Sequence, residues 1–138
     1  MPAPEFLDTN VFVYAYDASV PHKQRTAQDL VRRALSGEMV TSTQVLAELA
    51  ATFLHKVSPP ASASHVITIL DALSPIKTIA TDSEMVRRAV EIRASHGIHF
   101  YDSMIVAAAE RSGASRIWSE DLNSGQDYVG IRVENPFV

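Results

Sequence analysis

The sequence predicts a single α/β domain, residues 1–138, built on a short parallel β-sheet of about five strands with helices on both faces. Short apolar segments alternate with longer amphipathic ones along the chain, which is typical of strands joined by helices. Prolines and glycines stand where those helices should begin and end. With 138 residues, 46% of them hydrophobic, the chain is long enough to bury an apolar core.

The first half of the chain is expected to form strands at residues 5–7 and 38–41, and helices at 10–16, 21–35 and 43–57. Pro21 suits the first turn of the second helix, where a missing N–H costs nothing, and Gly37 suits its end. The third helix carries an apolar stripe of Val45, Leu46, Leu49 and Phe53.

The second half is expected to form strands at residues 76–80, 116–118 and 131–134, and helices at 63–73, from 82 to about 95, and at 101–111. Asp82 suits an N-cap, and Gly97 and Gly113 suit helix ends. Because strands alternate with helices, the strands should lie parallel. In such a sheet, ligands bind beyond the carboxyl ends of the strands, where the strand order reverses.

Composition and charge limit the classes of function. The chain has no cysteine, so it forms neither a disulfide nor a thiolate metal site. It has no signal-peptide pattern and no apolar stretch of about 18 residues, so we expect a cytoplasmic protein with no membrane partner. The net charge of −4 argues against a nucleic-acid partner. Acids gathered around a metal would lower that total, however, and local basic surfaces could remain at Lys23, Arg25, Arg32, Arg33, Arg87, Arg88 and Arg93.

Four acids, far apart in the sequence, fall where this fold would bring them to one rim. Asp8 directly follows the first strand, and Asp121 lies in a turn just past the fourth. Glu48 is the only acid in the helix at 43–57, and Asp102 lies near the start of the helix at 101–111. Carboxylates without a His, Cys or Lys partner indicate a hard cation, so the group predicts a Mg²⁺ or Mn²⁺ site. Without a metal, four close acids would repel one another, and some should be protonated.

Each acid also has a simpler interpretation. Asp8 could be an ordinary N-cap, Glu48 a solvated helix residue, and Asp121 a common turn residue. Asp102 could be a cap as well, but its expected helical neighbours form the apolar set Ile105, Val106 and Ala109. Ser103, Glu110 and Arg111 should face elsewhere. A carboxylate on an apolar face is costly unless it is paired or binds a metal.

Two other kinds of site are less well supported. His96 and His99 have a metal-like spacing, but Gly97 should break the helix that would align their rings. A phospho-acceptor domain of the receiver type would need adjacent acids after the first strand and a lysine after the last. The chain has Asp8-Thr9-Asn10 and only Arg132 at those places.

The four acid segments together resemble the PIN-domain nucleases, and among them the VapC-type toxins of toxin–antitoxin modules. The resemblance covers nearly the whole chain. It rests on the segments 6–11 (FLDTNV), 44–49 (QVLAEL), 99–109 (HFYDSMIVAAA) and 118–123 (WSEDLN), and the chain's ending, VENPF, is also similar. The third segment is the most specific, and the order and spacing of all four carry the resemblance.

The resemblance implies a Mg²⁺- or Mn²⁺-dependent endoribonuclease with Asp8 and Asp102 as principal metal ligands and Asp121 completing the site. Glu48 would bind the metal through water or orient the attacking water. Thr9, Asn10 and Ser119 would hold the carboxylates, and Asn123 stands where some relatives carry a further acid. It also implies a small antitoxin partner, a groove for it along residues 11–16, and a homodimer. A catalytically silent module that binds RNA or protein is the main alternative.

Overall fold

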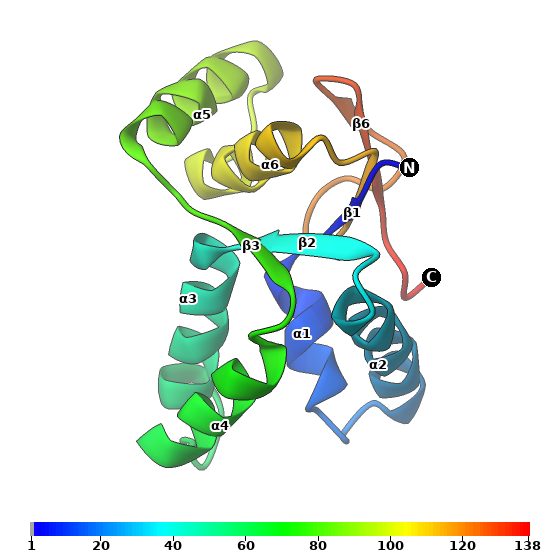
Figure 1. Cartoon of the computed structure of the whole chain (residues 1–138), viewed down its shortest axis with the longest axis vertical. Coiled ribbons are helices and arrows are strands. Elements are labelled where there is room, and N and C mark those ends of the chain that lie inside the picture. The colour runs from blue at the N-terminus through cyan, green and yellow to red at the C-terminus, as the bar shows by residue number, and fades with distance from the viewer. Residues whose placement is uncertain (1) are drawn as a thin grey trace.

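The computed structural model describes residues 2–138 and centres on one six-stranded sheet with helices on both faces (Figure 1). The strand order is β3-β2-β1-β4-β6-β5, and every neighbouring pair is parallel except β5 with β6. The strands are β1 (Glu5–Leu7), β2 (Met39–Ser42), β3 (Lys77–Ile79), β4 (Arg116–Trp118), β5 (Asp127–Tyr128) and β6 (Ile131–Glu134). The predicted fold class is confirmed, and β5 is a short strand that the prediction missed.

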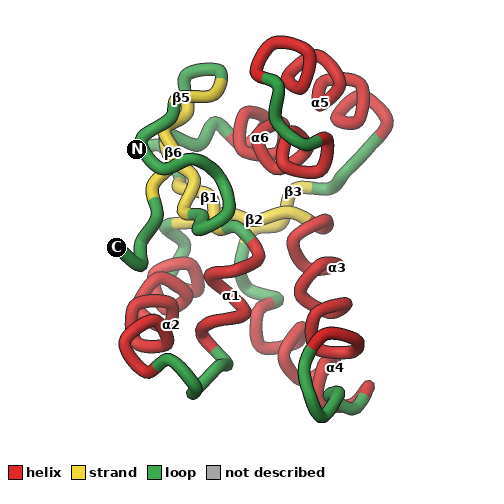
Figure 2. The backbone as a smooth tube through the Cα atoms, turned by 180° about the vertical axis from the view of Figure 1, so that it is seen from behind, coloured by secondary structure: helices red, strands yellow, loops and turns green. Residues whose placement is uncertain are grey.

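Within residues 2–138, six α-helices connect and cover the strands. Helices α5 and α6 lie on one face of the sheet and α1 to α4 on the other, as the views from opposite sides show (Figures 1 and 2). They are α1 (Thr9–Ala15), α2 (Pro21–Leu35), α3 (Thr43–Ala51), α4 (Ala63–Leu73), α5 (Ser83–His96) and α6 (Phe100–Ser112). Within residues 2–138, no helix has both the length and the apolar character needed to cross a bilayer.

The local signals place most helix ends correctly. Pro21 occupies the first turn of α2, and Asp82 caps α5 by accepting a hydrogen bond from Met85 N–H at 2.9 Å. Gly97 and Gly113 end α5 and α6 in the left-handed conformation, at φ of 67° and 74°. The prediction of one α-helix over residues 43–57 is wrong in its last part: α3 ends at Ala51 and continues as a π-helical turn, Thr52–Lys56.

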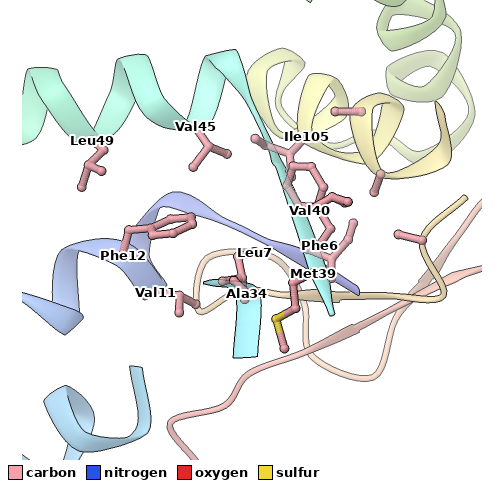
Figure 3. Packing of buried hydrophobic residues seen from close by; sticks show 14 of the residues in the cluster. Phe6, Leu7, Val11, Phe12, Ala34, Met39, Val40, Val45, Leu49 and Ile105 are labelled. Carbon is pink, nitrogen blue, oxygen red and sulfur yellow. The ribbon is translucent and has the colours of Figure 1, made fainter. Parts of the chain in front are cut away.

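The core lies on both sides of the two central strands. Phe6 and Leu7 of β1 are fully buried, and because side chains alternate along a strand they point to opposite faces. Figure 3 shows Phe6 and Val40 on the side of Ile105 from α6, and Leu7 on the other. Burial on both faces explains why β1 is an uninterrupted apolar segment.

Helix α6 is buried almost all round, because it lies between the sheet and α5 (Figure 1). Every residue from 103 to 109 is buried. The prediction that Ser103 faces away from the core is therefore wrong. Its hydroxyl satisfies its buried position by donating to the His99 carbonyl at 3.1 Å.

Candidate active site

The candidate site begins where the strand order reverses. From β1 the chain moves outward to β2 and β3, whereas β4 and β6 lie on the other side of β1. Leu7 and Trp118, the last residues of β1 and β4, are register partners, so the next residues, Asp8 and Ser119, leave the sheet side by side. This is the position at which parallel α/β sheets bind ligands.

Asp8 is buried at this rim, with only 4% of its surface exposed. Its Oδ1 accepts from Thr9 N–H at 2.7 Å, so the carboxylate does cap α1, and its Oδ2 accepts from the Ser119 hydroxyl at 2.7 Å. Burial raises the pKa of Asp8 to about 6, opposed by these two hydrogen bonds and reinforced by the charges of Asp121 and Glu48. Helix capping therefore accounts for only one of its two oxygens.

Asp121 is exposed and is tied to the same hydroxyl through its backbone. Ser119 Oγ accepts from Asp121 N–H at 3.2 Å, and Asp121 Oδ2 accepts from Asn10 Nδ2 at 3.1 Å. Asn10 Oδ1 in turn accepts from Glu120 N–H at 3.1 Å. The start of α1 and the turn after β4 therefore hold each other in place.

The residue before Asp121 is anchored independently. Glu120 accepts from Lys23 Nζ and from the Tyr14 hydroxyl, both at 2.7 Å. Lys23 is one of four predicted surface cations that form ion pairs within the molecule, the others being Arg32, Arg33 and Arg88. Pairing reduces the basic surface that the sequence suggested.

Glu48 is half-buried and reaches the rim from α3. Its Oε2 accepts from Thr9 Oγ1 at 2.9 Å and its Oε1 from Gln44 Nε2 at 2.7 Å. Gln44 Nε2 also donates to the Tyr101 carbonyl at 3.1 Å, which links α3 to the residue before Asp102. Gln44 was not predicted as a site residue, although its place four residues before Glu48 puts both side chains on one face of the helix.

Asp102 lies half-buried in the first turn of α6. The alternative that it caps this helix is wrong, since the N-cap is His99, whose side chain accepts from Tyr101 N–H. Burial raises the pKa of Asp102, the charges of Asp121 and Glu48 add to the rise, and His99 opposes it. Asp102 is less buried than Asp8, although it shares its side of α6 with apolar residues.

The four carboxylates are close enough for Glu48 and Asp121 each to raise the pKa of Asp8 and of Asp102. None of the four forms an ion pair with a residue in 2–138. Over the same residues, however, no three His, Cys, Asp or Glu side chains converge closely enough to hold one metal ion. The donor chemistry fits a hard cation, but the side chains would have to draw together around it.

A cavity of about 480 Å³ opens between α1 and α3 beside this rim. Two of the four acids, Glu48 and Asp121, contribute to its wall, whereas Asp8 and Asp102 do not. Among residues 2–138, Lys56 from the π-helical turn is the one cationic side chain that lines it. The whole lining is Thr9, Asn10, Val13, Tyr14, Asp17, Glu48, Ala51, Thr52, Lys56 and Asp121. Of the expected supporting residues, Thr9, Asn10 and Ser119 contact the acids, whereas Asn123 is exposed outside the cavity.

A family model described as the PIN domain matches residues 6–126, a range that contains all four acids. The chain belongs to the PIN domain family. No curated protein sequence matches it. Its mostly parallel sheet with helices on both faces is the architecture of a PIN domain.

Several solved structures share this PIN domain fold. A toxin–antitoxin complex from Klebsiella pneumoniae has a TM-score of 0.70 at 18% identity, over 96% of this chain and 98% of that one. The Mycobacterium tuberculosis VapC20, a toxin that cleaves the sarcin–ricin loop, has a TM-score of 0.68 at 18% identity, over 93% and 98%. VapBC2 from Rickettsia felis, bound to a fragment of its promoter DNA, has a TM-score of 0.65 at 20% identity, over 95% and 97%. At these identities the likeness concerns the fold.

Proposed function

We propose that this PIN domain, residues 1–138, is a Mg²⁺- or Mn²⁺-dependent endoribonuclease that acts as the toxin of a type II toxin–antitoxin system. The observation that carries the proposal is the hydrogen-bonded network at the switch point. Ser119 joins Asp8 to Asp121, Thr9 lies between Asp8 and Glu48, and Gln44 joins Glu48 to the start of α6. A purely structural role would pair the buried Asp8 with a cation, because an unpaired charge is costly to bury.

Asp8 and Asp102 would be the principal ligands of the metal, with Asp121 completing the site and Glu48 acting through water. When bound, the ion would lower the pKa of a water molecule and offset the charge of the phosphate. The chain itself keeps the carboxylates in place: Ser119 and Thr9 fix both oxygens of Asp8, and Gln44 fixes one of Glu48. Asn123 stands where some relatives carry an acid, so the chain supplies four carboxylates here rather than five.

The proposed partners are single-stranded RNA, a small antitoxin that blocks the site, and a second copy of the chain, in the cytoplasm. Solved structures of similar fold include toxin–antitoxin complexes, which supports the antitoxin. In the stretch proposed for the antitoxin groove, Val11, Phe12 and Ala15 belong to the core, whereas Val13 and Tyr14 line the cavity. Val13 and Tyr14 are therefore the residues of this stretch that border the cavity beside the candidate site.

The test is cleavage of single-stranded RNA by metal-free protein to which Mg²⁺ or Mn²⁺ is added back. We expect Asp8→Asn and Asp102→Asn to abolish cleavage and growth arrest while circular dichroism shows a retained fold. Asp71→Asn, an exposed acid on α4, is the matched control and should stay fully active. Full activity in both site variants would reject the assignment of these acids.

One observation favours the silent RNA- or protein-binding module as a second candidate. No three acids within residues 2–138 converge on a common point as they stand. This alternative predicts RNA or antitoxin binding without cleavage at any concentration of either metal. Isothermal titration of metal-free protein with Mn²⁺ separates the two, since a nuclease site should bind the ion and lose that binding in Asp8→Asn.

A further inference from the structure

A second cavity lies on the other side of Glu48, between α3 and the start of α6. It has a volume of about 340 Å³ and is lined by Gln44, Ala47, Glu48, Ala51 and Tyr101. We call it the α3–α6 slot. Glu48 and Ala51 also line the larger cavity, so the slot adjoins the candidate active site directly.

The aromatic wall of the slot is Tyr101, whose side chain is unusually exposed for such a large residue. The residue is 58% exposed, although burial of an aromatic ring normally stabilises a fold. Its ring stacks on His99, with centroids 5.8 Å apart and planes 29° from parallel, and meets the edge of Phe100 at 5.4 Å. Gln44 Nε2 donates to the backbone carbonyl of Tyr101, which ties the residue before Asp102 to α3.

The remaining lining suits a flat, uncharged group. Ala47 and Ala51 are one helical turn apart on α3 and have no side chain beyond Cβ, so they leave an apolar surface without projections. Gln44 Nε2 donates twice within the protein, to Glu48 and to the Tyr101 carbonyl, whereas Gln44 Oε1 accepts no hydrogen bond from residues 2–138 and can accept one from a ligand. The Glu48 carboxylate would repel a phosphate from the slot, which leaves a base as the part of a nucleotide that fits.

We propose that the α3–α6 slot binds one nucleobase of single-stranded RNA, with Tyr101 as the stacking partner. The proposal rests on the proposed function, since the base belongs to a nucleotide next to the phosphodiester at the four acids. Single-stranded RNA is recognised through unstacked bases that lie against aromatic rings, and stacking accepts every base because each has a π face. The slot therefore positions the substrate, and Gln44 Oε1 adds a preference for bases with an N–H at its edge.

The experiment is a binding cycle in the Asp8→Asn background, which is expected to be inactive. The probe is a single-stranded RNA that the wild type cleaves, with an abasic ribonucleotide placed in turn at each position around the cut. At one position, the abasic change should weaken binding by roughly 5- to 150-fold, the range of base–aromatic stacking. Tyr101→Ala should weaken binding of the intact RNA by the same factor and should have no further effect on that abasic RNA.

Three further variants sharpen the result. Tyr101→Phe keeps the ring and should bind as tightly as the parent, whereas Ala47→Leu should fill the slot and weaken binding with the ring intact. Tyr16→Ala removes another exposed tyrosine, 41% accessible and outside the slot, and should bind intact and abasic RNA as the parent does.

The outcomes distinguish this inference from the function on which it rests. Suppose that the wild type cleaves RNA, but that Tyr101→Ala weakens binding of intact and abasic RNA equally or changes the binding of neither. The slot then does not hold a base, and the nuclease assignment stands. If Tyr101→Ala weakens only binding of an antitoxin, the slot is a protein contact and the proposal is wrong. If the wild type cleaves no RNA with either metal, the proposed function fails and this inference fails with it.

Discussion

Ser119 donates a 2.7 Å hydrogen bond to Asp8 across the carboxyl ends of two paired parallel strands. The same hydroxyl accepts from Asp121 N–H and from Leu122 N–H, at 3.2 and 3.3 Å. The hydroxyl of the fully buried Ser119 therefore positions both the side chain of Asp8 and the backbone of Asp121. Such hydrogen bonds orient carboxylates and tune how readily they ionise.

Ser119→Ala should weaken both the site and the fold. It leaves the buried Asp8 Oδ2 and the two N–H groups without their partner, so the free energy of unfolding should fall by about 1–3 kcal/mol. In the wild type the hydrogen bond from Ser119 lowers the pKa of Asp8, so this pKa should rise when the variant loses the bond. The acidic limb of the pH–cleavage profile should then move to higher pH. Ser74→Ala, which removes an exposed hydroxyl at the end of α4, is the control and should leave that limb unmoved.

Asp8 should make the metal-free protein less stable as the pH rises. Its pKa is about 6 in the fold against an ordinary 3.8, so the native state binds more protons than the unfolded state between these values. Stability therefore falls as pH rises through this window, by about 3 kcal/mol in total for this group, and is constant above it. In Asp8→Asn the side chain at this position cannot ionise, so this pH-dependent loss of stability should be absent.

The measurement is urea unfolding of both proteins in chelator from pH 4 to pH 8. The difference in stability between wild type and Asp8→Asn removes titrations common to both, and should change by about 3 kcal/mol across the window. Saturating Mg²⁺ should restore stability to the wild type at pH 8 and not to the variant. Parallel curves in chelator would show that burial does not perturb this carboxyl.

The fold was largely predictable because its local signals agree with its long-range order. Pro21 opens α2 as predicted, and the uninterrupted apolar segment of β1 matches burial on both faces. The short strand β5 escaped because its turn lacks the usual Asn-Gly signal. Val129 and Gly130 form that turn instead, with φ of 47° and 83°, and valine rarely adopts the left-handed conformation.

How deeply each of the four acids is buried was harder to predict than which strand end, helix or turn carries it. Helical periodicity shows which side of α6 Asp102 shares with apolar residues, but not that its first turn lies at the edge of the packed layers. Asp8 follows a central strand with β2 and β4 on either side, and those neighbours bury it. The parts that Gln44 and Lys56 play in the site could not be predicted. The contact of Gln44 with Glu48 depends on how α3 packs against the rim, and the position of Lys56 depends on the π-helical turn. A hydrophobic pattern specifies neither feature.

Thr9 should act as a positioning residue for Glu48. Thr9→Val has nearly the same shape but no hydroxyl, so Glu48 Oε2 loses its 2.9 Å hydrogen bond while Gln44 still holds Oε1. Losing a group that orients a ligand typically costs about 10- to 100-fold in activity or metal affinity. We expect a fall of that size in kcat, with stability changed by about 1 kcal/mol. Thr9→Ser keeps the hydroxyl and should keep most of the activity; equal loss in both variants would assign the effect to packing.

Lys56 should contact an RNA phosphate, because it is the cationic side chain on the cavity beside Glu48 and Asp121 and pairs with no acid within residues 2–138. Lys56→Ala should weaken binding of single-stranded RNA in the Asp8→Asn background. It should also reduce the slope of log K against log salt by about 0.7, the value for one phosphate contact on a single strand. Lys77→Ala, at the amino end of β3, is the matched control, since that end of the sheet lies away from the acids. A weaker affinity with an unchanged salt slope would mean that Lys56 supports the cavity without touching the RNA backbone.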